Sequence, residues 1–299
     1  TSAPVTITYT ITPESDPAGC EGATFTYTVT VNPEPVITAG QTPTTCSDNA
    51  LNYEIELDNF NNPADNVTFT WAAPTLNPAV AGFTGGSARA GASAANITDA
   101  FTNTTNAAGT ATYTITPVYG GCTGADETVV VQVNPEPVGS NATATICSGE
   151  SLNYNLQGNI NSNNGVASLF TYTVASSNPG AVAAGADRVG ATNANITDTY
   201  TNTSGASVTI TYTITPESDP AGCEGNTFTY TVTVDPEPVG SDDTDAICSG
   251  GTLNYDLQNN IDGNNGITSL FTYTVASTDA GNVPPASARG TASDANITD

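Results

Sequence analysis

The sequence predicts an all-β protein made of tandem immunoglobulin-like β-sandwich domains, about 101 residues per repeat, arranged end to end. Residues 5–36 recur almost unchanged at 208–239, differing only at Ala23/Asn226 and Asn32/Asp235, and a diverged copy spans 111–138. Apolar residues alternate with threonine at a period of two, which is typical of half-buried strands, and helical periodicity is absent. A fixed repeat of this length indicates an array of small domains.

The recurring segment reads as two strands and a turn, followed by a stiff exit. In the first copy, β-branched and aromatic residues alternate with threonine over 5–12 and again over 24–31. Pro17 and Gly19 interrupt the pattern and predict the turn. The exit at 32–35 contains Pro33 and Pro35, which have no N–H to donate to a ladder. We therefore expect a short, semi-rigid linker.

Four segments follow from this period. Residues 1–36 are the C-terminal hairpin of a repeat, 37–137 and 138–238 are complete repeats, and 239–299 begin a further one. In 138–238 we expect seven strands, near 142–148, 151–157, 168–176, 182–190, 194–203, 207–216 and 227–234, with a loop at 159–165. Seven short strands in about 100 residues are typical of an immunoglobulin-like sandwich. The expected core consists of Leu152, Tyr154, Leu156, Phe170, Tyr172, Val174, Ile196, Ile210, Tyr212, Ile214, Phe228, Tyr230 and Val232.

The two ends of the chain are complementary parts of one repeat. Residues 239–299 match 138–198 at 36 of 61 positions, and Thr1 aligns with Ser204. Two explanations stay open: a window on a longer periodic protein, which we favour, or a subunit that polymerises by strand complementation.

The charge excludes several classes of protein. The chain has 29 acidic residues, 3 arginines, no lysine and no histidine, for a net charge of −26. Such a chain lacks the basic footprint of a nucleic-acid-binding protein and would not dock on anionic lipid. No apolar run is long enough to cross a membrane. Without histidine, a Ser-His-Asp or Cys-His catalytic arrangement and a His-ligated zinc site are excluded, and we expect no enzyme.

Six cysteines alternate in spacing, at 20, 46, 122, 147, 223 and 248. We expect the turn before the last strand to lie beside the first strand of its own repeat. On this argument the disulfides are Cys46–Cys122 and Cys147–Cys223, and Cys20 and Cys248 bond to partners outside the chain. One bridge per repeat indicates an oxidising, extracellular compartment.

Each repeat carries one arginine at an aligned position: Arg89, Arg188 and Arg289. We expect a structural ion pair or a fork to backbone carbonyls within the sandwich. The alternative is a contact that fixes the angle to the neighbouring repeat.

No cofactor is required by the sequence, and calcium is the one ion that it leaves open. The asparagine-rich loops and the linkers contain hard oxygen donors of the kind that calcium takes. The candidates are Asp58, Asp65 and Asp262 in the loops, and Glu136 and Glu237 in the linkers.

Several motifs occur in a fixed order: Ile-Cys-Ser-Gly, Leu-Asn-Tyr, Tyr-Thr-Val, Tyr-Thr-Ile-Thr-Pro, Gly-Cys-x-Gly and Thr-Val-x-Pro-x-Pro-Val. This order resembles the PKD-like immunoglobulin-type tandem repeats of giant bacterial cell-surface adhesins, as in gliding Bacteroidetes with type 9 secretion. The resemblance implies an extracellular stalk or filament, located at the bacterial cell surface, whose repeats have no enzymatic activity.

We therefore expect a structural segment of an adhesin fibre that serves attachment or gliding. The expected partners are neighbouring repeats or subunits, with surface polysaccharide as a further candidate. A pilus-like subunit and a carbohydrate-binding module are the alternatives.

Overall fold

The computed structural model describes residues 3–60, 66–92, 95–293 and 296–298. The chain forms two compact units. The first contains the residues up to Val138 together with Asn164–Ala167 and Glu217–Gly225, and the second contains the remainder. Strands dominate both units, which confirms the predicted all-β class.

The first unit contains two hairpin-bearing parts of the sequence. At its N-terminal end β1 (Val5–Ile11) pairs antiparallel with β2 (Phe25–Val31). The following repeat holds a sheet of seven strands along the path β3-β13-β11-β5-β8, with β6 and β12 also paired to β11. Its strands are β3 (Thr44–Cys46), β5 (Thr68–Trp71), β6 (Thr75–Asn77), β8 (Arg89–Ala92), β11 (Gly109–Tyr119), β12 (Cys122–Thr123) and β13 (Glu127–Asn134). Short pairs complete it: β4 (Tyr53–Glu54) with β9 (Asn96–Ile97), and β7 (Phe83–Gly85) with β10 (Phe101–Asn103).

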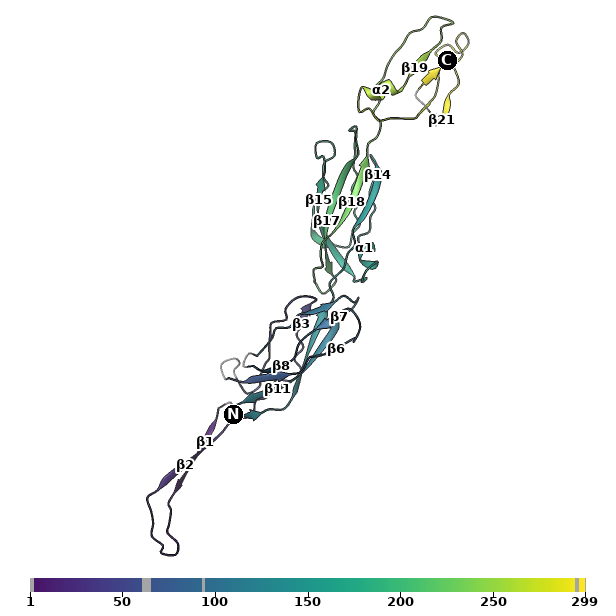
Figure 1. Ribbon diagram of the computed structural model, residues 1–299. Helices are drawn as coiled ribbons and strands as arrows, with labels where there is room; N and C mark the ends of the chain where they lie inside the picture. The colour runs from purple at the N-terminus through teal and green to yellow at the C-terminus, as the bar shows by residue number, and fades with distance from the viewer. Residues whose placement is uncertain (1–2, 61–65, 93–94, 294–295, 299) are drawn as a thin grey trace. The chain divides into compact units, whose positions relative to one another are not determined.

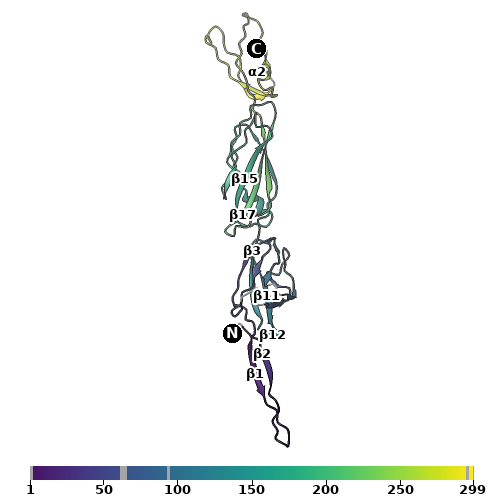
Figure 2. The same cartoon turned by 90° about the vertical axis from the view of Figure 1, so that its left-hand side faces the viewer.

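The second unit repeats this plan. A five-stranded sheet has the order β14-β18-β17-β15-β16, and β15 and β17 lie side by side in both views (Figures 1 and 2). The strands are β14 (Ala142–Cys147), β15 (Ser168–Ser176), β16 (Arg188–Thr192), β17 (Val208–Ser218) and β18 (Phe228–Asp235). The last part of the chain holds two small pairs of strands: β19 (Asn254–Asp256) with β22 (Asn296–Thr298), and β20 (Phe271–Tyr273) with β21 (Arg289–Ser293).

Alternation decides which side chains enter the core. Along β17 and β18, every second residue is buried, because successive side chains of a strand point to opposite faces of the sheet. The equivalent strands β11 and β13 alternate in the same way. Most of the expected core of 138–238 is buried, whereas Tyr154 and Val174 are only partly buried.

Several expectations about local structure are wrong. Of the strand expected at 182–190, only the end is strand, as the beginning of β16 (Arg188–Thr192). Part of the expected loop at 159–165 is helix α1 (Gln157–Asn161), and the last repeat has an equivalent helix, α2 (Gln258–Asp262). One helical turn is too short to produce a periodic pattern, but it buries Ile160 completely. The strands expected at 151–157 and 194–203 are reduced to the isolated bridges Ser151↔Thr199 and Tyr154↔Ile196.

Candidate functional site

The first strand of each complete repeat runs parallel to its last strand. In the first complete repeat, Cys46 pairs with Asn134, and in the second, Cys147 pairs with Asp235. Each first-strand cysteine therefore lies at the C-terminal end of the last strand, where the chain leaves the repeat. A serine fastens this end: the Ser47 N–H donates to the Asn134 carbonyl at 2.9 Å, and Ser47 Oγ accepts from the Asn103 N–H at 2.9 Å.

A disulfide joins Cys46 to Cys223, with 5.5 Å between their Cα atoms. Cys223 is 1% exposed and belongs to the turn between β17 and β18. Both cysteines lie in the first compact unit, although in the sequence they belong to consecutive repeats. The bond therefore links the first strand of one repeat to the hairpin turn of the next.

The expected pairs Cys46–Cys122 and Cys147–Cys223 are not formed in the structure. Our expectation neglected the direction of the first strand. Cys122 precedes β13, whereas Cys46 lies beside the far end of that strand. Eight strand residues at about 3.3 Å each separate the two ends, well beyond the Cα separation of about 7 Å that a disulfide tolerates.

The other four cysteines, Cys20, Cys122, Cys147 and Cys248, have free thiols. Cys122 occupies a position equivalent to that of Cys223. Its Sγ donates to the carbonyl of Asn32 over 3.6 Å, and Asn32 is the repeat equivalent of Asn134. The thiol of Cys122 therefore lies at the exit end of the hairpin β1–β2.

One asparagine in each asparagine-rich loop makes two hydrogen bonds to the backbone of a linker, and we call this pair of bonds an asparagine clamp. We did not predict these bonds from the sequence. The Asn164 amide donates to the Glu136 carbonyl at 2.7 Å, and its oxygen accepts from the Val138 N–H at 3.1 Å. Asn59 makes the same pair of bonds to Glu34 and Val36, and Asn265 makes it to Glu237 and Val239. The recurrence of Asn164 at Asn265 was a sequence signal that could have shown this.

The second glycine of the Gly-Cys-x-Gly motif permits a close approach of two backbones. A Cβ at Gly124 would overlap the carbonyl oxygen of Pro35. Next to it, the Asn32 side chain donates to the Gly120 carbonyl at 2.9 Å. The hairpin turn of one repeat therefore packs directly on the linker that precedes that repeat.

The calcium candidates have other hydrogen-bond partners. Asp58 accepts from Thr38 Oγ1 at 2.7 Å, and Asp262 accepts from the Gln258 amide at 2.8 Å. The carbonyls of Glu136 and Glu237 accept from the clamping asparagines. Asp65 lies outside the described residues. Within the part of the chain that the structure describes, no three His, Cys, Asp or Glu side chains gather into a metal-binding group.

The three arginines lie over an aromatic ring of their own repeat. The guanidinium carbons of Arg89, Arg188 and Arg289 are 4.2, 4.6 and 4.9 Å from the ring centroids of Trp71, Tyr172 and Tyr273. Each guanidinium also donates to a backbone carbonyl seven residues further along: Arg89 to Asn96, Arg188 to Asn195 and Arg289 to Asn296. These contacts connect the strand that contains each arginine to the segment seven residues later in the same repeat.

A buried tyrosine hydroxyl is held by an aspartate. The Tyr212 hydroxyl donates to Asp198 Oδ2 at 2.6 Å, and Tyr113 donates to Asp99 in the other repeat. Burial, and then the hydrogen bond to Asp198, raise the pKa of Tyr212 above its usual range. The tyrosine therefore stays protonated and serves as a donor in the core.

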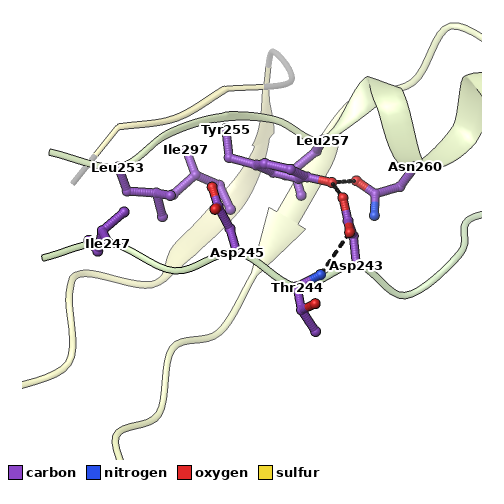
Figure 3. Close-up of a pocket in the computed structure, with 9 residues that line it drawn as sticks. All are labelled: Asp243, Thr244, Asp245, Ile247, Leu253, Tyr255, Leu257, Asn260 and Ile297. Carbon is purple, nitrogen blue, oxygen red and sulfur yellow. Dashed lines mark hydrogen bonds between the residues drawn. The ribbon is translucent and has the colours of Figure 1, made fainter.

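A pocket of about 380 Å³ opens in the last part of the chain (Figure 3). Three of its lining residues are the repeat equivalents of buried residues in the preceding repeat: Leu253 of Leu152, Leu257 of Leu156 and Ile297 of Ile196. At its rim the Tyr255 hydroxyl donates to Asp243 at 2.6 Å, as Figure 3 shows. The lining residues are Asp243, Thr244, Asp245, Ile247, Leu253, Tyr255, Leu257, Asn260 and Ile297.

The solved structures that are similar to this chain include arrays of several domains. Mouse protocadherin-24 EC1-3 is 16% identical, with 78% of this chain and 80% of that chain covered and a TM-score of 0.28. The chicken CNTN1 FN1-FN3 domains are 10% identical, with 75% and 77% covered and a TM-score of 0.29. No curated protein matches the sequence. None of the helices in the described residues has the length and apolar character of a membrane span.

The family comparison identifies the repeats. The model of the PKD-like domain matches three times, at residues 1–35, 43–137 and 144–238. These matches cover most of the chain and follow the period read from the sequence. The chain therefore belongs to the PKD-like domain family.

Proposed function

We propose that the chain is a structural segment of an extracellular fibre or stalk of a bacterial surface adhesin, serving attachment or gliding rather than catalysis. The observation that carries this proposal is the disulfide from Cys46 to Cys223, which ties consecutive repeats covalently. The asparagine clamps on the proline linkers add a second, non-covalent connection.

This arrangement suits a protein that bears tension. When the chain is pulled from its ends, the disulfide carries the load past the 177 positions between Cys46 and Cys223. The strands between these two cysteines, which belong to both complete repeats, are then not stretched. A net charge of −26 keeps parallel fibres apart.

Single-molecule pulling of the chain tests the mechanical part. Oxidised chain should extend less than reduced chain by roughly 600 Å, because 177 bypassed positions each span at most about 3.3–3.6 Å. Equal extensions with and without reductant would exclude a load-bearing disulfide. Antibody labelling of intact and lysed cells tests location: labelled surface filaments support the proposal, and label only after lysis contradicts it.

Calcium and polysaccharide stay proposals that accompany this function. Glu136 is the preferred calcium candidate, since the charge of Asp48 acts on its carboxyl and raises its pKa, after the larger effect of burial. Calorimetric titration of the chain with calcium should then give a binding heat, and this heat should be lost in the Glu136→Gln variant. A titration without heat would contradict calcium binding at Glu136. Glycan-array binding tests polysaccharide, and a signal weakened by competing soluble glycan supports it.

A further inference from the structure

Two of the three clamp asparagines are followed directly by a glycine. Asn164 precedes Gly165 and Asn265 precedes Gly266, and these are the two Asn-Gly pairs of the sequence. Both glycines are exposed, and both have a positive φ, of 69° and 66° respectively. The chain therefore places its two Asn-Gly pairs where the asparagine has the same structural role.

The third clamp has the same hydrogen bonds but a different neighbour. Asn59 bonds to the backbone of Glu34 and Val36, as the other two clamp asparagines bond to their linkers. The residue that follows it is Phe60, whose side chain is buried. The molecule thus contains its own control for any effect of the glycine.

An Asn-Gly pair favours a reaction of the side chain with the backbone that follows it. The glycine nitrogen attacks Cγ of the asparagine, so that a C–N bond forms and the Cγ–Nδ2 bond breaks. The N–H proton leaves with the departing ammonia, and water then opens the succinimide at either carbonyl to give aspartate or isoaspartate. Because glycine has no Cβ, its nitrogen reaches Cγ in conformations that a larger side chain obstructs. Asparagine is for such reasons a thermolabile residue.

The closed clamp restrains this reaction. The Nδ2 of Asn164 donates to the Glu136 carbonyl at 2.7 Å, and its Oδ1 accepts from the Val138 N–H at 3.1 Å. Both polar atoms of the carboxamide are therefore held by the linker. We expect the Gly165 nitrogen to attack mainly when local opening releases them.

The product of the reaction cannot rebuild the clamp. A carboxylate accepts hydrogen bonds but has no group that donates. At position 164 it would present a negative oxygen, in place of an N–H, to the carbonyl oxygen of Glu136. Isoaspartate also lengthens the backbone by one methylene. At Asn265 a further bond would be lost, because its Nδ2 also donates to the Thr203 carbonyl at 3.3 Å.

We propose that Asn164 and Asn265 are sites of spontaneous deamidation, and that their conversion opens the two clamps irreversibly. These two linkers then pass from a clamped to an unclamped state as the protein ages, whereas the linker held by Asn59 stays clamped. The inference goes beyond the proposed function and does not depend on it, because it concerns the chemistry of the clamps wherever the protein is located.

Ageing of the full 299-residue chain tests the reaction. The folded chain and the chain in guanidinium are kept at mildly alkaline pH in ¹⁸O-labelled water, and peptides from pepsin digestion in acid are analysed by mass spectrometry. In guanidinium, Asn164 and Asn265 should react at least about tenfold faster than Asn59, with incorporation of ¹⁸O and formation of isoaspartate. In the folded chain both should react at least about tenfold more slowly than in guanidinium. Equal rates at Asn59 and Asn164 in guanidinium, or equal rates with and without guanidinium, would overturn the proposal.

The variant Gly165→Asn tests the role of the glycine. Asparagine tolerates a positive φ better than most residues, and a Cβ at Gly165 meets no atom within 4 Å. The clamp should therefore be kept, with unchanged hydrogen exchange at the Val138 amide. Deamidation of Asn164 should become at least about tenfold slower, while Asn265 keeps its rate as the internal control. An unchanged rate at Asn164 would contradict attack by the glycine nitrogen.

The variant Asn164→Asp tests the consequence for the linker. Hydrogen exchange at the Val138 amide should become roughly five- to tenfold faster, because the clamp has lost its donor. Asn161→Asp is the control: it adds the same charge in the same loop, and its side-chain oxygen still accepts from the Gln157 amide, now at 3.0 Å. Exchange at Val138 should be unchanged in this control. Unchanged exchange in Asn164→Asp, or equal acceleration in both variants, would overturn the opening of the clamp by deamidation.

Discussion

The hairpins β1–β2 and β17–β18 have almost the same sequence but different surroundings. Their registers are identical, with Tyr9 opposite Tyr27 and Tyr212 opposite Tyr230. Tyr9 is 52% exposed, whereas Tyr212 is completely buried. Strand pairing is therefore local to the hairpin, but burial depends on the rest of the repeat.

Residues 239–299 show the same dependence of strand formation on a partner segment. Ala142–Cys147 forms β14 because β18 offers it a parallel partner. The equivalent residues 243–248 form no strand. The sequence of a first strand is therefore not sufficient to form that strand, because its backbone groups need the last strand of the repeat as their hydrogen-bond partner.

The largest difference between the two hairpins should appear when the equivalent tyrosine ring is removed from each of them. Tyr230→Ala should lower the free energy of unfolding by about 3–5 kcal/mol, since a buried, stacked ring is lost. Tyr27→Ala should cost less than about 0.5 kcal/mol in the monomeric chain, because Tyr27 is exposed. Urea denaturation of both variants measures the difference, and equal losses would mean that β1–β2 is also buried.

The second largest difference in stability should be between substitutions of the two turn cysteines, Cys223 and Cys20. Cys223→Ser removes the disulfide to Cys46 and should cost about 2–4 kcal/mol, since the unfolded chain gains freedom. Cys20→Ser, at the equivalent position, removes only an exposed thiol and should leave the stability of the monomer unchanged. Thermal unfolding without reductant tests this. A drop of the same size in Cys20→Ser would show that Cys20 is also bonded.

The two linkers that follow these hairpins should be affected equally when their asparagine clamps are removed, in contrast to the hairpins themselves. Asn59→Ala and Asn265→Ala each remove the two hydrogen bonds of a clamp, worth about 1 kcal/mol each. Hydrogen exchange at the Val36 and Val239 amides should therefore become roughly five- to tenfold faster. The exposed Asn193→Ala serves as the control and should leave both amides unchanged. Unchanged exchange in the clamp variants would contradict the clamp.

The smallest effect concerns pH at the linker between the complete repeats. Burial, and then the charge of Asp48, raise the pKa of Glu136. The folded chain then binds a proton more tightly than the unfolded chain, so stability is greatest below the unfolded pKa and falls as pH rises through the folded pKa. Glu136→Gln should raise the melting temperature slightly at about pH 7 and have no effect at about pH 3. The exposed Glu224→Gln is the control, and a gain that persists in acid would contradict a charge effect.

Local pattern was sufficient to predict several elements. The alternation of apolar residues with threonine identified β15, β17 and β18, because side chains in strands alternate between faces whatever their partners are. Composition alone, through the absence of histidine, excluded whole classes of catalytic and metal site. The motif order identified the PKD-like family. The boundaries of the repeats stay a prediction.

Other features depend on how distant segments meet. Helix α1 arises from the burial of Ile160, and the Asn164 clamp joins a loop to a linker 28 positions earlier. Cysteine spacing alone allowed several pairings. The parallel pairing of β3 with β13 decided between them, because it carries Cys46 to the exit of its repeat and away from Cys122. The sequence by itself thus determined the long strands, the period and the family, while the tertiary structure decided the disulfide partners and burial, which depend on contacts between residues far apart in the chain.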